Sequence, residues 1–136
     1  MIAVDIHGTI THAAWREPII QLQGWDEYYA QAAHDEPCKP IIRLINGLVR
    51  TGEKVVGMTE TPERYRELTM RWLVYNNVLL DEIYMRPEDD WRSAVDLKMS
   101  FLDEMPEQVS IAIDDSEAVI DAFRARGITT LHINGR

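Results

Sequence analysis

Several polar residues with catalytic potential come at the ends of apolar runs that lie far apart in the sequence. Asp5 follows one such run, Thr59 follows a second, and the pair Asp114-Asp115 follows a third. Lys98 lies near the start of a segment with helical spacing. Because the carboxyl ends of parallel strands meet at one edge of a sheet, we expect these side chains to converge there.

Three carboxylates at one sheet edge repel one another unless a cation neutralises them. Oxygen ligands of this kind suit Mg²⁺, which commonly uses one or two carboxylates together with waters and a substrate phosphate. The ammonium of Lys98 and the hydroxyl of Thr59 are suited to hold phosphate oxygens beside a carboxylate nucleophile. Asp5 considered alone has a simpler interpretation as a turn cap, because Asp-x-x-Gly-Thr is also a turn sequence.

The apolar patterning predicts alternating strands and helices that would position these residues. Short buried runs predict strands at 2–4, 54–58, 82–85, 109–113 and 128–133. Helical spacing predicts helices at 40–50, 61–75 and 94–105 and between Ser116 and Gly127, with Thr61 as the N-cap of the second. The pattern of segment 12–37 is weaker, and we expect an irregular insertion over the first strand, with room for helical pieces at 17–22 and 26–33.

This alternation favours an α/β fold with right-handed crossovers and a mostly parallel sheet covered by helices on both faces. The 136 residues, 46% of them hydrophobic, fit a single domain spanning 1–136. The segment between the first and second strands is too short for a large cap domain. We therefore expect an open site.

The composition narrows the classes of partner and compartment. A formal net charge of −9 argues against general binding to nucleic acid or to anionic membranes, although a nucleotide or a nucleic-acid end can still bind locally. No apolar run approaches the ~20 residues that span a bilayer, and no secretory signal is evident. The single Cys38 cannot form an internal disulfide, so we expect a cytoplasmic protein. The sequence predicts no oligomeric state.

The order of these motifs resembles that of the haloacid dehalogenase superfamily of phosphatases, whose fold is a Rossmann-like three-layer sandwich. The corresponding motifs are Asp5-Ile6-His7-Gly8-Thr9, Thr59, Lys98 and Asp114-Asp115, and the resemblance covers nearly the whole chain. Residues 61–73 and 84–92 are further similar to the phosphatase domain of phage-type polynucleotide kinase-phosphatases.

The resemblance implies a two-step hydrolysis of phosphomonoesters. Asp5 would attack phosphorus to give an aspartyl-phosphate, which water would then hydrolyse. Thr59 and Lys98 would bind the transferring phosphoryl group. The ligands of Mg²⁺ would be Asp5, the backbone carbonyl of His7, Asp114 and, in support, Asp115.

Further substrate contacts follow from the same resemblance. Gly8 and Thr9 of the first motif are expected to bind substrate, and Arg86 and Arg92 are candidates for contact with a nucleotide or a second phosphate. Arginines in an exposed loop are also commonly just solvated. Three aromatic residues of the insertion also have two interpretations, since they could stack on a base or complete the core: Trp25, Tyr28 and Tyr29.

The sequence departs from the family pattern at two positions. His7 stands where these phosphatases carry a second aspartate as general acid and base, and Glu60-Thr61 stands where relatives often have Gly-Arg. Neutral imidazole can accept a proton from water, and imidazolium, with an unperturbed pKa of about 6.5, can protonate a leaving oxygen. His7 is therefore a candidate catalytic residue. A slow enzyme, a different phosphotransfer and an inactive binding protein all stay open.

Our leading hypothesis is a Mg²⁺-dependent phosphatase acting on a phosphorylated nucleotide or a nucleic-acid 3′-phosphate end. The open site favours an extended substrate, whereas the acidic balance favours a mononucleotide or another small phosphomonoester. The alternative is a phosphate-binding or regulatory protein that kept the fold and lost turnover at His7. A signalling receiver is disfavoured, because such proteins carry the acidic pair after the first strand and the phospho-accepting aspartate later.

Overall fold

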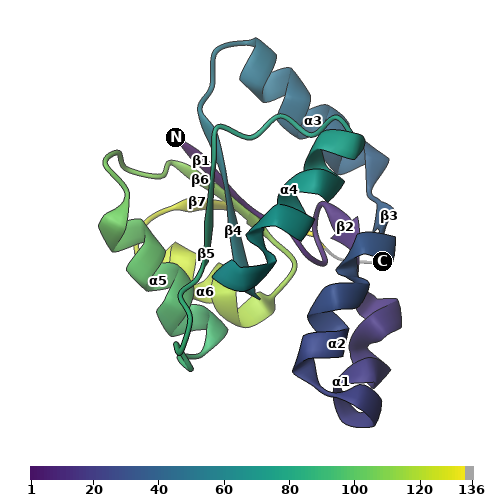
Figure 1. Cartoon of the computed structure of the whole chain (residues 1–136). Coiled ribbons are helices and arrows are strands. Elements are labelled where there is room, and N and C mark those ends of the chain that lie inside the picture. Colours follow the sequence, from purple (N-terminus) through teal and green to yellow (C-terminus); the bar gives the residue numbers. More distant parts are fainter. Residues whose placement is uncertain (134–136) are drawn as a thin grey trace.

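A five-stranded parallel sheet forms the centre of the molecule (Figure 1). The computed structural model describes residues 1–133. From one edge to the other the strands are β5 (Glu82–Arg86), β4 (Val55–Pro62), β1 (Ile2–Asp5), β6 (Ile111–Asp114) and β7 (Thr129–His132). Every neighbouring pair in this sheet is parallel, and β1 is hydrogen-bonded on both sides, so its carboxyl end opens at the middle of the sheet edge.

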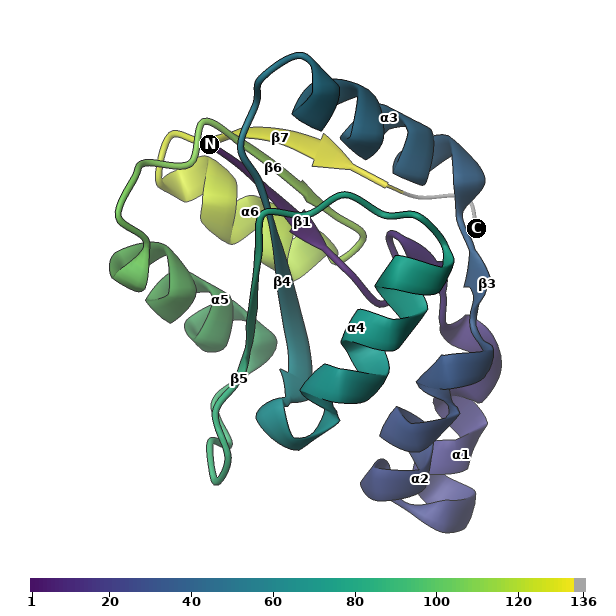
Figure 2. The ribbon, with the colours of Figure 1, turned by 45° about the horizontal axis from the view of Figure 1, so that its top comes forward.

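Two helices cover each face of the sheet, which gives the three layers expected from the sequence (Figure 2). One face packs against α3 (Lys39–Arg50) and α4 (Arg66–Tyr75), and the other packs against α5 (Ala94–Glu104) and α6 (Glu117–Ala125). Side chains alternate along β1, so Ile2 and Val4 enter the first core and Ala3 enters the second. Asp5 lies two residues after Ala3, so its side chain points to the same face of the sheet, toward α5.

The insertion after β1 is ordered, in contrast to the irregular segment expected from the sequence. It begins and ends in a two-stranded antiparallel ribbon, β2 (Thr11–His12) with β3 (Glu36–Pro37). Between these strands lie η1 (Ala14–Arg16), α1 (Glu17–Gln23), α2 (Trp25–Ala30) and η2 (Gln31–His34). Figures 1 and 2 show α1 and α2 projecting beside the body of the domain as a helical hairpin. The helical pieces considered at 17–22 and 26–33 correspond to these short helices.

The connection from β4 to α4 also differs from the sequence prediction. Strand β4 continues to Pro62 instead of ending at Met58, η3 (Glu63–Tyr65) follows it, and α4 begins only at Arg66. Thr61 is therefore wrong as a helix N-cap. The hydroxyl of Thr61 is buried and hydrogen-bonded within the site described below. The register between β4 and β5 shifts between Thr59 and Pro62, because a proline cannot donate a backbone hydrogen bond to the neighbouring strand.

No helix within residues 1–133 is both long enough and apolar enough to cross a membrane.

Candidate active site

The carboxyl ends of β1 and β6 bring two buried aspartates together. Asp5 ends β1 and Asp114 ends β6, and the two residues are 4% and 0% exposed. Lys98, on the second turn of α5, reaches between them: its Nζ lies 2.8 Å from Asp5 Oδ1 and 2.6 Å from Asp114 Oδ2. These residues are far apart in the sequence, and the parallel topology alone gives them a common edge.

The remaining oxygens of the two aspartates each have one further donor. The hydroxyl of Thr9 donates to Asp5 Oδ2 at 3.0 Å, and the backbone N–H of Ser116 donates to Asp114 Oδ1 at 2.9 Å. Both donors come from the turn that follows the respective strand. The turns therefore fix the orientation of each carboxylate before any ligand binds.

The electrostatic balance of this cluster is anionic. Burial and the nearby Asp114 carboxylate raise the pKa of Asp5 well above its usual value, although the Lys98 ammonium opposes them. Burial disfavours the charge of Lys98, but Asp5 and Asp114 outweigh it and hold the pKa of the ammonium above its usual value. Asp115, which is exposed, adds a third carboxylate. One oxygen from each of the three aspartates can be chosen so that all lie within 4.8 Å of one another.

A cation fits this donor set. Three carboxylates face a single ammonium, so two negative charges are in excess even before a phosphate arrives. Carboxylate oxygens are the ligands that Mg²⁺ prefers. Asp5, Asp114 and Asp115 are thus the residues of the described chain that could hold it.

Gly8 permits the close approach of Asp115 to the loop after β1. The φ of Gly8 is +96°, and a Cβ at this position would lie 2.6 Å from Asp115 Oδ2. Only glycine meets both conditions without strain. The substrate contact expected of Gly8 stays a prediction, whereas its need for a small side chain is a property of the fold.

His7 lies in a hydrogen-bonded group with two threonines of β4. Its Nδ1 is 3.0 Å from the hydroxyl of Thr59 and 3.0 Å from that of Thr61. The Thr59 hydroxyl also lies 3.1 Å from that of Thr61, so the three groups form one hydrogen-bonded network in which the donor and acceptor roles follow the tautomer of the ring. Burial, helped by the positive charge of Arg16, lowers the pKa of His7 from 6.5 to about 3. The ring is therefore neutral at pH 7.

Thr61 is the member of this site that the sequence interpretation missed. Thr59 and Thr61 are two positions apart on one strand, so they share a face of the sheet. That spacing was the available signal. It was obscured because Thr61-Pro62-Glu63 is also typical of a helix start.

Arg86 and Arg92 organise the loop that follows β5. Arg86 donates to the backbone carbonyls of Glu60, Asp90 and Arg92 at 2.9, 3.2 and 2.7 Å. Arg92 pairs with the carboxylate of Asp90, with Nε 3.0 Å from Oδ2. Substrate contact by either arginine stays a prediction, and it would need these bonds to be exchanged.

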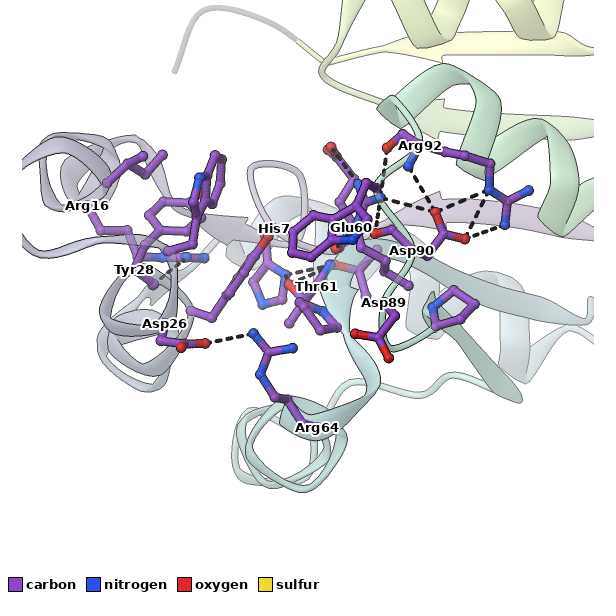
Figure 3. A pocket seen from close by; sticks show the side chains of 18 of the residues that line it. His7, Arg16, Asp26, Tyr28, Glu60, Thr61, Arg64, Asp89, Asp90 and Arg92 are labelled. Carbon is purple, nitrogen blue, oxygen red and sulfur yellow. Dashed lines mark hydrogen bonds and ion pairs between the residues drawn. The ribbon is translucent and has the colours of Figure 1, made fainter.

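A cavity of about 660 Å³ opens above Asp5, His7 and Thr59. Its walls come from the helical hairpin on one side and from the loop after β5 on the other. Figure 3 shows Tyr28 on the hairpin side, His7 in the middle and Arg92 on the loop side. The reactive edge of the sheet is therefore accessible to a ligand that enters between these two walls.

The parallel sheet and the aspartates, threonine and lysine at its edge define a phosphatase domain of haloacid dehalogenase type. Residues 1–135 match the family described as the polynucleotide kinase PNKP phosphatase domain, and the chain belongs to this family. Both resemblances stated from the sequence are thereby confirmed. No curated protein sequence matches the chain.

Solved structures show the same fold. The Pnkp1/Rnl/Hen1 RNA repair complex contains a chain that is 23% identical with a TM-score of 0.85, over 98% of this chain and 42% of that one. A haloacid dehalogenase-like hydrolase from Streptococcus pneumoniae is 15% identical with a TM-score of 0.68, over 98% and 83% of the two chains. The D,D-heptose 1.7-bisphosphate phosphatase from B. bronchiseptica, in complex with magnesium and phosphate, is 17% identical with a TM-score of 0.60, over 95% and 77%. The present chain thus spans less than half of the similar chain in the RNA repair complex.

Proposed function

We propose that the chain hydrolyses a phosphomonoester at a nucleotide or a nucleic-acid 3′ end, with Mg²⁺ and an aspartyl-phosphate intermediate. The observation that carries this proposal is the position of Asp5, which lines the cavity and accepts hydrogen bonds from Lys98 and Thr9. Membership of the PNKP phosphatase family supports a nucleic-acid end as the substrate.

In the first step a carboxylate oxygen of Asp5 attacks phosphorus. A bond forms between that oxygen and phosphorus, the ester bond breaks, and the leaving oxygen takes a proton from water. Lys98, which is 2.8 Å from Asp5 Oδ1, balances the charge of the nucleophile and then that of the phosphoryl oxygens. Thr59 binds the phosphoryl group through its hydroxyl, which requires it to release its bond to Thr61.

In the second step water attacks the phosphorus of the aspartyl-phosphate, and the bond between phosphorus and the Asp5 oxygen breaks. The attacking water returns a proton to solvent, which balances the proton taken in the first step. Asp5 is regenerated as a carboxylate, and inorganic phosphate is released. Asp5, the carbonyl of His7, Asp114 and Asp115 would hold Mg²⁺, which supplies neutralisation of the phosphate oxygens in both steps. With the ring proton on Nε2, His7 donates a hydrogen bond to the leaving oxygen of the first step. Since a neutral imidazole is a weak acid, we expect turnover to be slower than with a carboxylic acid at this position.

The setting of the reaction is part of the proposal. A free, buried Cys38 fits the reducing cytoplasm. The similar Pnkp1 chain belongs to an RNA repair complex with Rnl and Hen1. We propose that this chain removes phosphate from nucleic-acid ends that another activity then seals or modifies.

The experiment is phosphate release from nucleoside 3′- and 5′-monophosphates, 3′-phosphorylated oligonucleotides and an aryl phosphate, with and without Mg²⁺. Asp5→Asn is the blank, and metal-dependent release that disappears in the blank supports the proposal. Absence of release above the blank on every substrate contradicts it.

The second candidate is a phosphate-binding protein without turnover, and the neutral, hydrogen-bonded state of His7 favours it. His7→Asp distinguishes the two. A large gain in hydrolysis identifies an impaired site, whereas a loss identifies His7 as an adapted catalytic residue. Binding of inorganic phosphate without hydrolysis in both forms supports the second candidate.

A further inference from the structure

The helical hairpin carries aromatic side chains that do not serve the hydrophobic core. Neither α1 nor α2 contains a buried residue. Even so, α2 presents three aromatic residues, all of which line the cavity above Asp5, and Trp25 is 55% exposed. The core interpretation of these rings is therefore wrong. Tyr29 also packs against Tyr65, with ring centroids 5.3 Å apart, but the rings still present aromatic surface to a ligand in the cavity beside Asp5.

The rings are arranged as a preformed array. Trp25 and Tyr29 are stacked, with centroids 5.7 Å apart and an interplanar angle of 30°. Tyr28 meets Trp25 edge-on at 5.5 Å, and the guanidinium of Arg16 lies 4.4 Å from the Tyr28 ring centroid. Because the rings support one another, a planar ligand can stack without first ordering the side chains.

A fourth aromatic ring comes from the opposite wall. Trp91, in the loop after β5, lines the same cavity and is 90% exposed. That loop is held by the bonds from Arg86 to the carbonyls of Asp90 and Arg92. The cavity thus has an aromatic surface on the hairpin side and another on the loop side, with the reactive aspartate at its floor.

The charges of the cavity do not suit a polyanionic backbone. Among the described residues that line it there are four arginines, and each already donates hydrogen bonds to the chain. Arg16 pairs with Asp35, Arg64 with Asp26, and Arg92 with Asp90. Acidic side chains also line the same walls: Glu17, Asp26, Glu60, Asp89 and Asp90. Stacking, and not charge, is the attraction that this cavity offers.

We propose that the aromatic array binds the nucleobase of the terminal nucleotide whose phosphate lies at Asp5. The cavity would then recognise one unpaired nucleoside by its ring, with little contribution from the phosphodiester backbone. This inference rests on the proposed function, because it deepens the substrate class of that site. It predicts dependence on the base and near independence from salt.

The first test compares a nucleoside 3′-monophosphate with an abasic sugar phosphate. In the wild type, kcat/KM for the substrate with a base should exceed that for the abasic one by roughly tenfold or more, as one stacked base provides. Trp25→Leu should reduce this ratio toward one, whereas Trp25→Phe should keep most of it. The matched control is Tyr75→Leu, which removes an 85% exposed aromatic ring outside this cavity and should leave the ratio unchanged.

The second test varies salt and chain length. We expect log KM for a 3′-phosphorylated oligonucleotide to change little with log salt concentration, because few counterions are released. We also expect KM to be similar for a short and a long single strand. A steep salt dependence, or affinity that grows with each added nucleotide, would overturn the inference in favour of backbone recognition.

A binding measurement separates this inference from the proposed function. Nucleoside monophosphate is titrated into the Asp5→Asn variant, and tryptophan fluorescence is followed. Quenching that is lost in Asp5→Asn/Trp25→Leu supports the stacking site even if the wild type releases no phosphate. Hydrolysis without any preference for a base, and without quenching, overturns the stacking site and leaves the phosphatase proposal intact.

Discussion

Two buried ionic sites contain similar groups but have different roles. Arg16 and Asp35 lie where the hairpin joins the body of the domain, which we call the hairpin root, and Lys98 lies with Asp5 and Asp114 at the sheet edge. Arg16 and Asp35 have side chains that are 1% and 0% exposed, much like Lys98 and its two aspartates. Asp35, however, accepts four hydrogen bonds: two from Arg16 and one each from Thr11 and Trp15. These four bonds use the acceptor capacity of a carboxylate. Asp5 accepts two.

The difference lies in the number of donors, not in burial. A carboxylate whose acceptors are all used has nothing left for a ligand, so the Arg16–Asp35 pair serves to fix the hairpin to the body. The indole N–H of Trp72 on α4 reinforces that attachment by donating to the Asp35 carbonyl at 2.9 Å. Asp5 keeps unused lone pairs and lies beside like-charged carboxylates. A bound cation, or a bond from Asp5 to phosphorus, therefore reduces the repulsion between them.

The largest expected effect separates catalysis from stability at the sheet edge. Asp5→Asn should reduce phosphate release by about 1,000-fold or more, because it removes the nucleophile while preserving shape. The free energy of unfolding should change by less than about 1 kcal/mol, since the amide can still accept from Lys98. Phosphate release and urea unfolding check the two parts. Substantial residual hydrolysis would contradict the role of Asp5.

The opposite pattern is expected at the hairpin root. Arg16→Met should lower the free energy of unfolding by about 3–5 kcal/mol, because it leaves a buried carboxylate without its counter-charge. Asp35→Asn should have a similar effect, and the double variant should lose less than the sum of the two. Urea unfolding of all four proteins measures this coupling. Additive losses would show that the two side chains act independently.

A smaller effect is expected from Gly8→Ala, with Gly127→Ala as its control. Both glycines have positive φ, +96° and +78°, so either alanine should cost about 1–3 kcal/mol of backbone strain. Only at Gly8 does the new Cβ meet Asp115, whereas nothing lies within 4 Å of one at Gly127. Gly8→Ala alone should therefore raise the Mg²⁺ concentration needed for thermal stabilisation. Equal metal dependence in both variants would contradict Asp115 as a ligand.

The smallest effect concerns the exposed contact between the hairpin and η3. A hydrogen bond from Arg64 is the main cause that lowers the pKa of Asp26 below 3.8, and that of Glu88 below 4.5. Lowered carboxyl pKa values stabilise the folded state above the unfolded pKa, and this contribution disappears as the pH falls through the folded value. The stability difference between wild type and Arg64→Ala should thus be small at about pH 6 and vanish below about pH 3. Urea unfolding across this range provides the measurement, and a difference that grows on acidification would contradict it.

The sequence was sufficient for the sheet and for the residues at its edge. Apolar runs that end in Asp5, Thr59 and Asp114 indicated strands, and the parallel topology implied their convergence. Such signals are local, because strand patterning and chain order are read directly from neighbouring residues. Lys98 was included because a lysine near the start of a helix can reach the same edge, and the family pattern then implied its role.

The hairpin and its root could not be predicted in this way. Arg16 and Asp35 are 19 positions apart, and no periodicity links them. Their pairing depends on the fold of the segment between them. The aromatic residues of α2 were equally ambiguous, because burial is decided by whether a helix packs against the body. Pro62 concealed the length of β4, since a proline after threonine also suits a helix start.

The strand order has a consequence for how the chain folds while it is being synthesised. β1 is the earliest strand in the sequence, but it lies at the middle of the sheet, where Ile2 pairs with both Val55 and Ile111. Pairings of such sequence separation form slowly, and unpaired strand edges are prone to aggregate while they wait. Asp5 can form its buried ion pair only after Lys98 and Asp114, which follow it in the chain, have been synthesised. β1 precedes all its partner strands and is therefore enclosed only when they are complete.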